Sequence, residues 1–282
     1  MEVVSEIRAL RERREAMRGS VGLVPTMGNL HHGHLALVRE ARAQCANVVA
    51  TIFVNPTQFA PNEDFASYPR TLAQDMEQLE GAHVDVVFAP EAAEMYPRGR
   101  EGLTMVSVPA LADTLCGAAR PGHFHGVATV VAKLLHLARP HRAFFGEKDW
   151  QQLAIIQAMA RDLDMATQIV GVPTVRASDG LALSSRNQYL TPGERDRAAL
   201  IYSKLCDIRD AIDGGEGDYA GLEAHASRDL ATAGFKVDYV AVRDAERLVT
   251  PDRHTQSLRI LAAARLGRAR LIDNVGASVA GS

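Results

Sequence analysis

Short apolar runs alternate with helix-like stretches along the first 175 residues. Five runs are nearly continuous and rich in Val, Ile and Phe, as in strands buried on both faces of a parallel sheet. They span residues 21–26, 47–54, 84–90, 142–147 and 167–175. The stretches between them, residues 34–45, 71–81, 127–138 and 150–163, are predicted to be helices. The alternation indicates an α/β domain with a parallel sheet wrapped by helices.

The pattern changes after residue 175. Residues 177–196, ASDGLALSSRNQYLTPGERD, contain many turn formers and show no periodicity, which predicts a functional loop at a domain boundary. Two helical stretches follow at 192–213 and 219–233, and then strand-like runs at 235–242 and 257–273. The sequence therefore predicts two domains, a larger one over residues 1–176 and a small α+β domain over 177–282.

Composition and charge narrow the possible functions. The chain has 282 residues, 47% of them hydrophobic and 23% charged, which is typical of a globular protein. The formal net charge is -3 with both signs interspersed, so no nucleic-acid partner is expected. The N-terminus is charged throughout and no apolar run approaches the roughly 20 residues of a membrane span, so we expect no membrane partner and a cytoplasmic protein.

Cysteine and lysine usage carry two further expectations. The three cysteines are scattered without CxxC spacing, which argues against a disulfide framework and a structural zinc site. Lysine occurs only at positions 133, 148, 204 and 236. A lysine inside a polar motif, such as Lys148, is therefore a candidate functional residue.

The strongest local motif is PTMGNLHHGH, residues 25–34, with the spacing HxGH. A strand is predicted to end at Thr26 and a helix to open near His34, and phosphates bind readily at helix N-termini. His31 and His34 could donate hydrogen bonds to phosphate oxygens. Gly33 would let a nucleotide lie against the backbone.

Two alternatives remain open for this motif. It could be a histidine-rich surface turn, or a metal site built from His31, His32 and His34. His32 is expected to face solvent.

The segment FFGEKDWQQL, residues 144–153, lies where a predicted strand ends, and ligands of open α/β sheets bind at that edge. Lys148 supplies a compact positive charge for a triphosphate. Glu147 or Asp149 could bind ribose hydroxyls or cap the helix, and Gln151 and Gln152 suit a hydroxy acid. The alternative is an ordinary charged helix start.

Two other segments carry polar groups. In the loop at 179–187, Ser184, Ser185 and Arg186 could close over departing pyrophosphate, although a plain linker has the same composition. Asn55 and Gln58 follow the strand predicted to end at Val54 and could bind a small polar substrate or form an Asx turn. His123 and His125 are secondary candidates, and the chain has no GxxxxGK[ST] loop.

Together, PTMGNLHHGH, FVNPTQF, RPGHF, FFGEKDWQQL and VGVPTVRASDGLALSSRNQYLT resemble, in the same order, the motifs of the pantothenate synthetase family. The resemblance extends from residue 1 to about residue 274. It implies a Rossmann-like N-terminal domain of the HIGH-type nucleotidylyltransferase superfamily, a C-terminal lid and a homodimer. It also implies an ATP- and Mg²⁺-dependent condensation of (R)-pantoate with β-alanine, giving pantothenate, AMP and pyrophosphate through a pantoyl-adenylate.

The resemblance assigns roles residue by residue. The residues matching ATP-binding positions are Met27, Gly28, Asn29, Leu30, His31, His32, Gly33, His34, Gly146, Glu147, Lys148, Asp149, Val175, Leu183, Ser184, Ser185 and Arg186. Catalytic roles are implied for His34, His31, Lys148, Ser184, Ser185 and Arg186. Pantoate and β-alanine contacts are implied for Gln58, Gln152, Asn55 and His123. His125 and His32 depart from the family pattern, where an Arg and an acidic residue are expected in some members.

Two rival functions remain open from the sequence. The same HxGH turn serves nucleotidylyltransferases that stop at the adenylyl product, which need no amine acceptor. A catalytically silent nucleotide sensor would bind ATP and release no pyrophosphate. A tRNA synthetase fragment is disfavoured because the chain lacks a basic extension.

Overall fold

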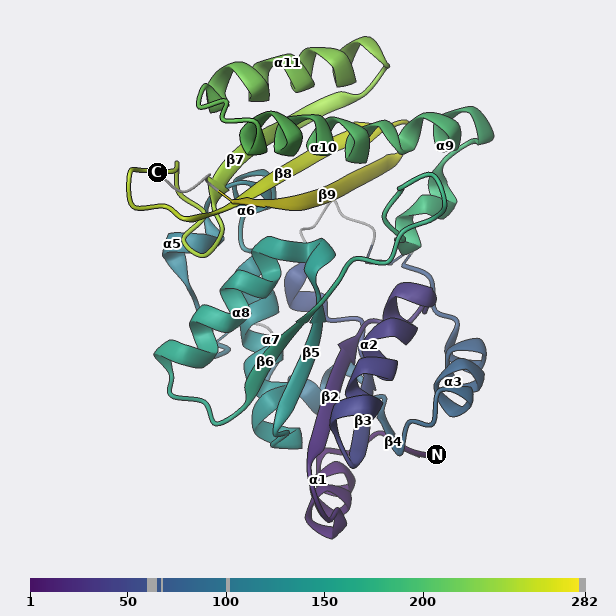
Figure 1. The fold of residues 1–282 in the computed structure, drawn as a ribbon. Coiled ribbons are helices and arrows are strands. Elements are labelled where there is room, and N and C mark those ends of the chain that lie inside the picture. The colour runs from purple at the N-terminus through teal and green to yellow at the C-terminus, as the bar shows by residue number, and fades with distance from the viewer. Residues whose placement is uncertain (60–64, 67, 100–101, 279–282) are drawn as a thin grey trace. The chain divides into compact units, whose positions relative to one another are not determined.

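The computed structural model describes residues 1–59, 65–66, 68–99 and 102–278 (Figure 1). The chain divides into two compact units. The N-terminal unit comprises Met1–Glu147 and Gln152–Pro173, and the C-terminal unit comprises Lys148–Gln151 and Thr174–Ser282. The four residues Lys148–Gln151 thus group by their contacts with the C-terminal unit, although the residues on either side of them in the chain belong to the N-terminal unit.

A six-stranded parallel sheet forms the centre of the N-terminal unit, in the order β1-β4-β3-β2-β5-β6. Its strands are β1 (Glu2–Val4), β2 (Val21–Thr26), β3 (Asn47–Ile52), β4 (Val86–Phe88), β5 (Arg142–Gly146) and β6 (Gln168–Val172). Apart from β1, this is a Rossmann-like strand order, so the predicted α/β fold is confirmed. All carboxyl ends of the strands therefore meet at one edge, where the candidate residues follow β2, β3 and β5.

Helices connect these strands. They are α1 (Ile7–Ala16), α2 (His32–Gln44), α3 (Leu72–Gly81), α4 (Ala92–Met95), α5 (Pro109–Ala112), α6 (Cys116–Ala119), α7 (His123–Ala138) and α8 (Trp150–Asp162), with short 3₁₀ turns η1 (Pro56–Gln58) and η2 (Glu147–Asp149). Alternate strand residues such as Val24, Ala50 and Phe144 pack against Val38 of α2 and Leu79 of α3. The neighbouring strand residues point to the opposite face, so both faces of the sheet are buried, as the continuous apolar runs predicted.

The sheet differs from the sequence prediction at its ends. β1 was not predicted, because it has three residues and only Val4 is buried. β3 ends at Ile52, two residues early, since the chain turns into η1. α7 begins at His123 rather than at residue 127, because its first turn, HFHG, is too polar and glycine-bearing to show helical periodicity.

The C-terminal unit is a three-stranded antiparallel sheet, in the order β7-β8-β9, covered by α10 and α11 (Figure 1). Its elements are η3 (Ser185–Tyr189), α9 (Pro192–Ala198), α10 (Leu200–Asp213), α11 (Tyr219–Thr232), β7 (Lys236–Asp244), β8 (Ser257–Leu266) and β9 (Ala269–Ser278). Its core brings Ile201, Leu205 and Ile208 of α10 against Ile260 and Ala262 of β8. The predicted α+β composition is therefore confirmed.

Two predicted segments of this unit are split. Residues 192–213 form α9 and α10, which meet at Ala199. Residues 257–273 belong to β8 and β9, which reverse at Gly267 with φ +54°. The sequence does not reveal either break, because the apolar pattern continues across it and the apolar residues on both sides enter the same core. In the described part of the chain, no helix combines the length and the apolarity that crossing a membrane requires.

Candidate active site

The HxGH motif begins with a tight turn directly after β2. Gly28 and Asn29 both have left-handed backbone conformations, with φ of +81° and +52°. The Gly28 amide donates to Oγ1 of Thr26 at 3.2 Å, and that hydroxyl donates to the carbonyl of Thr51 at 2.6 Å. The last residue of β2 thus fixes the first step of the turn.

A buried carboxylate of α3 holds the next two residues. Oδ2 of Asp75 accepts from the Asn29 amide at 2.9 Å, and Oδ1 accepts from the Leu30 amide at 2.8 Å. Oγ1 of Thr71 also donates to Oδ2, at 3.1 Å, and Asp75 is only 1% exposed. Sequence reasoning missed Asp75, because a single acidic residue early in a predicted helix gives no sign that it faces a distant turn.

His31 and His34 cap α2 reciprocally. Nδ1 of His31 accepts from the Gly33 amide at 3.1 Å, and Nδ1 of His34 accepts from the His31 amide at 3.3 Å. The two rings lie 4.1 Å apart between centroids. A nitrogen that accepts carries no hydrogen, so in each neutral ring the hydrogen lies on Nε2.

The position of the His31 ring favours glycine at position 33. A Cβ at this position would lie 2.7 Å from Cε1 and 2.8 Å from Nδ1 of His31, closer than real contacts allow. The missing side chain therefore makes room for the His31 ring over the helix end. The sequence prediction that Gly33 admits a nucleotide remains a prediction, and this internal packing is a separate reason for glycine.

His32 is exposed, as expected for the middle residue of the motif. Within the described residues, no group of three His, Cys, Asp or Glu side chains is arranged to hold a metal ion. Nδ1 of His31 and Nδ1 of His34 each accept a hydrogen bond from a backbone amide.

Asn55 is buried behind η1, and its side chain is fully engaged. Its Oδ1 accepts from the Tyr96 hydroxyl at 2.7 Å and from the amide and hydroxyl of Thr57 at 3.3 and 2.9 Å. Its Nδ2 donates to Oε1 of Gln58 at 3.1 Å and to the Gly126 carbonyl at 3.2 Å. Asn55 therefore orients the amide of Gln58 and links it to α7.

Gln58 connects this network to the HxGH turn. Its Nε2 lies 2.9 Å from Sδ of Met27, the residue before Gly28. Its backbone carbonyl lies 2.7 Å from Nδ1 of His123, which must donate because a carbonyl can only accept. Nε2 of His123 then accepts from Arg120 at 2.9 Å. Met27, Asn55, Gln58 and His123, predicted from three separate motifs, thus form one contiguous group.

Close approach of α7 to η1 makes this group possible. A Cβ on Gly126 would lie 2.3 Å from the Thr57 carbonyl oxygen and 2.7 Å from the Gln58 amide nitrogen. Glycine at position 126 is thus needed for the two elements to touch. Of the secondary candidates, His123 joins the group, whereas Nε2 of His125 lies 4.0 Å from Oδ1 of Asp113.

In the C-terminal unit, Lys148 and Ser184 line one pocket. Its walls combine apolar side chains with polar groups; the lining residues are Lys148, Leu181, Ala182, Ser184, Asn187, Ile201, Leu271, Ile272 and Asp273. The Lys148 ammonium lies 3.8 Å from Oδ1 of Asp149. The hydroxyl oxygen of Ser184 accepts from the Arg186 amide at 3.3 Å, which starts η3 and leaves the hydroxyl hydrogen to donate. One residue of each of two predicted motifs, Lys148 and Ser184, therefore lines the same pocket within this unit.

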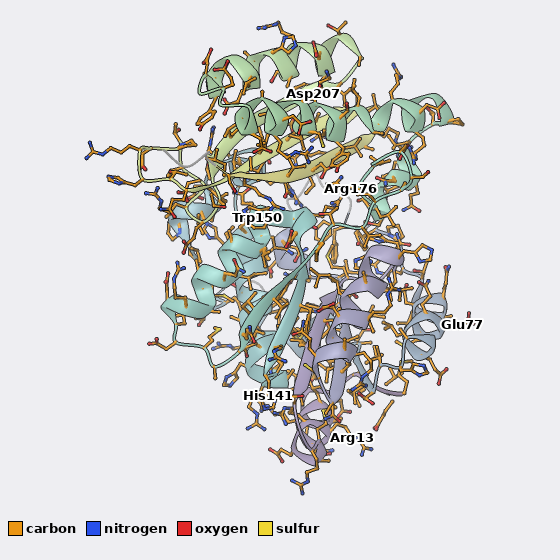
Figure 2. The ribbon with its side chains drawn as sticks, viewed as in Figure 1. Arg13, Glu77, His141, Trp150, Arg176 and Asp207 are labelled. Carbon is orange, nitrogen blue, oxygen red and sulfur yellow. The ribbon has the colours of Figure 1, made fainter. Side chains whose placement is uncertain are left out.

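Residues around this pocket are anchored to β8 and β9. Nδ2 of Asn274 donates to the Lys148 carbonyl at 2.8 Å, and Oδ1 of Asn274 accepts from Arg259 at 2.6 Å. The Arg259 guanidinium lies 3.6 Å from the ring centroid of Trp150, whose Nε1 donates to the Ala245 carbonyl at 2.8 Å. Figure 2 labels Trp150. These contacts explain why Lys148–Gln151 group with the C-terminal unit.

The loop predicted at 179–187 forms part of a small hairpin. Leu183 donates its amide to the Val175 carbonyl at 3.0 Å, and Arg176 pairs with Ala182. Arg176 forms a two-pronged ion pair with the buried carboxylate of Asp273, at 2.6 and 2.8 Å, and lies 3.7 Å from the Tyr202 ring centroid (Figure 2). The hairpin is thereby fixed to β9 and α10.

The remaining candidates fall in either unit. Gly146, Glu147 and Gln152 belong to the N-terminal unit, and all three are partly exposed. Asp149, Ser185 and Arg186 belong to the C-terminal unit and are also partly exposed. Besides Asp75, sequence reasoning missed Tyr96, which is distant in the chain from Asn55, the residue that it contacts.

Comparison with known proteins gives one consistent result. The family model described as pantoate-beta-alanine ligase matches residues 1–276. The chain is 53% identical to a pantothenate synthetase of Methylococcus capsulatus, over 98% of this chain and 97% of the relative. A pantothenate synthetase of Azotobacter vinelandii is also 53% identical, with 99% of each chain covered.

Solved structures agree with these sequence relatives. The pantothenate synthetase of Thermus thermophilus superposes with a TM-score of 0.90 at 47% identity, covering 98% of this chain and 99% of that one. A pantoate-beta-alanine ligase of Francisella tularensis, complexed with beta-gamma ATP and beta-alanine, gives a TM-score of 0.82 at 35% identity, covering 98% and 97%.

Proposed function

The chain belongs to the pantoate–β-alanine ligase family and is a ligase that condenses pantoate with β-alanine in an ATP-dependent reaction; from this premise we propose that it works through a pantoyl-adenylate formed at the HxGH turn. The products are then pantothenate, AMP and pyrophosphate. A carboxylate is a poor electrophile at neutral pH, so it must be activated before an amine can attack it.

The observation that carries the mechanism is the hydrogen bonding of the turn itself. The backbone amides of Gly28, Asn29, Leu30, His31 and Gly33 already donate to groups within the chain. Phosphate recognition at this turn therefore falls chiefly to side chains. His31 and His34 each accept a backbone amide hydrogen at Nδ1, so in the neutral rings the hydrogen lies on Nε2, and we assign this Nε2–H as the donor to a phosphate oxygen when ATP binds.

In the first step, an oxygen of the pantoate carboxylate attacks the α-phosphorus of ATP. The bond from the α-phosphorus to the bridging oxygen breaks, and pyrophosphate leaves with the electron pair. His31 and His34 stabilise the charge that develops on the phosphate oxygens, by hydrogen bonds that need no reorganisation because the capping box fixes both rings. Met27 to His34 form the ATP-binding turn.

Positive and hydroxyl groups of the other motifs complete this step. Lys148 and Arg186 neutralise phosphate charge, and Ser184 and Ser185 donate hydrogen bonds. Gly146, Glu147, Asp149, Val175 and Leu183 form the remaining ATP contacts. Mg²⁺ bound to the phosphates would neutralise further charge, and it would be held mainly by the phosphate oxygens of ATP.

In the second step, the β-alanine amine attacks the acyl carbon, the bond from that carbon to the AMP oxygen breaks, and the amine loses a proton. Gln58 orients both pantoate and β-alanine, and Gln152 is the second pantoate ligand. Asn55 and His123 orient Gln58: Asn55 donates to its side-chain oxygen, and His123 donates to its backbone carbonyl.

The proposal extends to the whole protein. Residues 1–176 bind ATP and pantoate, and residues 177–282 act as a lid. The protein works as a cytoplasmic homodimer, and sedimentation at micromolar concentration would test the dimer directly.

Isotope exchange tests the adenylate. The enzyme is incubated with ATP, Mg²⁺ and labelled pyrophosphate, with or without pantoate and without β-alanine. Label should enter ATP only when pantoate is present, because the first step reverses at the pantoyl-adenylate. Exchange that is independent of pantoate, or that requires β-alanine, would contradict an acyl-adenylate intermediate.

A further inference from the structure

We propose that Asp75 is a positioning residue for adenylate formation, because its buried carboxylate sets the turn that presents His31 and His34. The inference rests on the proposed function and adds a residue that lies 41 positions along the chain from His34. Asp75 acts through the turn rather than on ATP.

The carboxylate grips two successive amides, one with each oxygen. The Asn29 amide donates to Oδ2 at 2.9 Å and the Leu30 amide donates to Oδ1 at 2.8 Å. Thr71, directly before α3, donates its hydroxyl to Oδ2 at 3.1 Å. With 1% of Asp75 exposed, water does not compete for these bonds.

Asn29 and Leu30, which donate to Asp75, set the position of the imidazoles of His31 and His34. Asn29 has a φ of +52°, in the left-handed region that is uncommon for non-glycine residues, although asparagine enters it more readily than most, and the bond from its amide to Asp75 holds it there. Leu30 leads directly into His31, the N-cap residue of α2. A Cβ on Gly28 would lie 3.0 Å from Oδ2 of Asp75, so turn and carboxylate are in close contact. Releasing either amide therefore shifts His31 and, through the capping box, His34.

The same contacts explain how a carboxylate can lie beside a phosphate-binding turn. Two amide dipoles and a hydroxyl point their hydrogens at the carboxylate, which offsets its charge locally. Their engagement also directs phosphate recognition to Nε2 of the two histidines.

Asp75→Asn tests this role with little change of shape. The side chain of Asn keeps one acceptor oxygen, but its NH₂ group faces the second of the two turn amides. One hydrogen bond is thus replaced by two donors that face each other. The matched control is Asp85→Asn. Oδ2 of Asp85 accepts from the Val48 amide and from Arg42, both at 2.7 Å, but Asp85 precedes β4 at the opposite end of the parallel strands.

Three experiments are made on each variant: kinetics of pantoate-dependent pyrophosphate exchange, which give kcat and KM, thermal unfolding, which gives the thermal midpoint, and NMR of the imidazole ¹⁵N signals of His31 and His34. For Asp75→Asn we expect kcat to fall about 100-fold, as for a displacement of about 1 Å, and the Nε2–H pattern of both rings to change. For Asp85→Asn we expect a lower thermal midpoint with unchanged kcat and unchanged imidazole signals.

Thr71→Val is the milder variant, in case Asp75→Asn does not fold. It removes only the hydroxyl bond to Oδ2 and should lower kcat several-fold, without a change in KM for β-alanine in the full reaction. The proposal is overturned if Asp75→Asn, or Thr71→Val where the former does not fold, keeps the wild-type kcat or leaves both imidazole patterns unaltered. It is also overturned if activity falls only in proportion to stability, as in the control. Absence of exchange in the wild-type enzyme would instead refute the proposed function.

Discussion

At the scale of single residues, the chemistry depends on the different roles of the two nitrogen atoms in each imidazole of His31 and His34. His31 and His34 each use Nδ1 to accept from the backbone, which is a structural duty. The same bonds fix which nitrogen carries the hydrogen in the neutral ring. Each histidine can therefore have a structural and a catalytic role at once, because the capping bond to Nδ1 places the hydrogen of the neutral ring on Nε2.

Removing either an imidazole or the lysine tests these roles. We expect His34→Ala and Lys148→Ala each to reduce turnover at least 100-fold, since each removes a donor to a charged transition state. Far-UV circular dichroism should remain that of the wild type. His136→Ala, at an exposed position of α7, is the control and should retain turnover. Near-normal turnover of either purified variant would refute its assigned role.

A single methyl group tests the packing of His31. In Gly33→Ala the new Cβ would lie 2.7 Å from Cε1 of His31, so the ring must move. We expect turnover to fall at least about tenfold, because the His31 ring is displaced. The thermal midpoint should change little, because the helix preference of alanine over glycine, about 1 kcal/mol, offsets the cost of moving the ring. Gly81→Ala, which meets nothing within 4 Å, is the control. Equal turnover of the two variants would show that the ring position is unimportant.

At the scale of elements, the sequence predicts what periodicity and chain-local motifs encode. β2 was predicted at its observed bounds, and Gln58 and Lys148 were singled out because their motifs lie beyond the carboxyl ends of predicted strands, whereas Met27 was assigned through the family resemblance. Asp75, Tyr96 and Gly126 escaped prediction, since their importance comes from contacts with residues more than 40 positions away. The same distinction explains β1, whose pairing with β4 supplies what its three residues do not signal.

The hairpin at 175–183 is predicted to depend on the ion pair with β9. Arg176→Met leaves the Asp273 carboxylate buried without its partner, which should cost about 3 to 5 kcal/mol of unfolding free energy. Trp150, the only tryptophan of the chain, belongs to the C-terminal unit and reports its unfolding by fluorescence in urea. Arg209→Met breaks an exposed pair with Asp210 in the same unit and should cost less than about 1 kcal/mol. Similar losses in the two variants would contradict this account.

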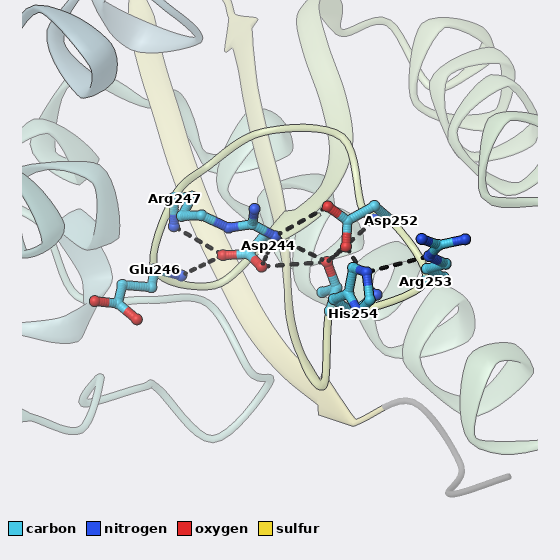
Figure 3. A network of polar contacts seen from close by, with 7 residues as sticks. Asp244, Glu246, Arg247, Asp252, Arg253 and His254 are labelled. Atoms are coloured by element: carbon cyan, nitrogen blue, oxygen red, sulfur yellow. Dashed lines mark hydrogen bonds and ion pairs between the residues drawn. The ribbon is translucent and has the colours of Figure 1, made fainter.

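At the scale of the whole molecule, the polar network around Asp244 in the loop from β7 to β8 makes the free energy of unfolding depend on pH in the acid range (Figure 3). Burial alone would raise the pKa of Asp244, but hydrogen bonds from Arg247, the Glu246 and Arg247 amides and Thr255 outweigh it and lower the pKa from 3.8 to about 2. A pKa lowered by folding stabilises the native state above the unfolded pKa, and this contribution is lost as pH falls toward the folded pKa.

Asp244→Asn measures that contribution. At pH 7 we expect the variant to be less stable than the wild type by about 2 kcal/mol in urea unfolding. At pH 2.5 the difference should shrink below about 1 kcal/mol, because the wild-type carboxyl is then losing its charge as well. A difference that is constant from pH 7 to pH 2.5 would mean that the hydrogen bonds do not depend on the charge of Asp244.

The most direct test of the central claim is AMP formation with each substrate omitted in turn. With ATP, Mg²⁺, pantoate and β-alanine together, AMP and pantothenate should appear in equal amounts. Omission of pantoate should abolish AMP formation, and omission of β-alanine should limit AMP to at most about one equivalent per active site, since the adenylate then has no acceptor. Continuous AMP release without β-alanine, or AMP without pantoate, would contradict a ligase that acts through a pantoyl-adenylate.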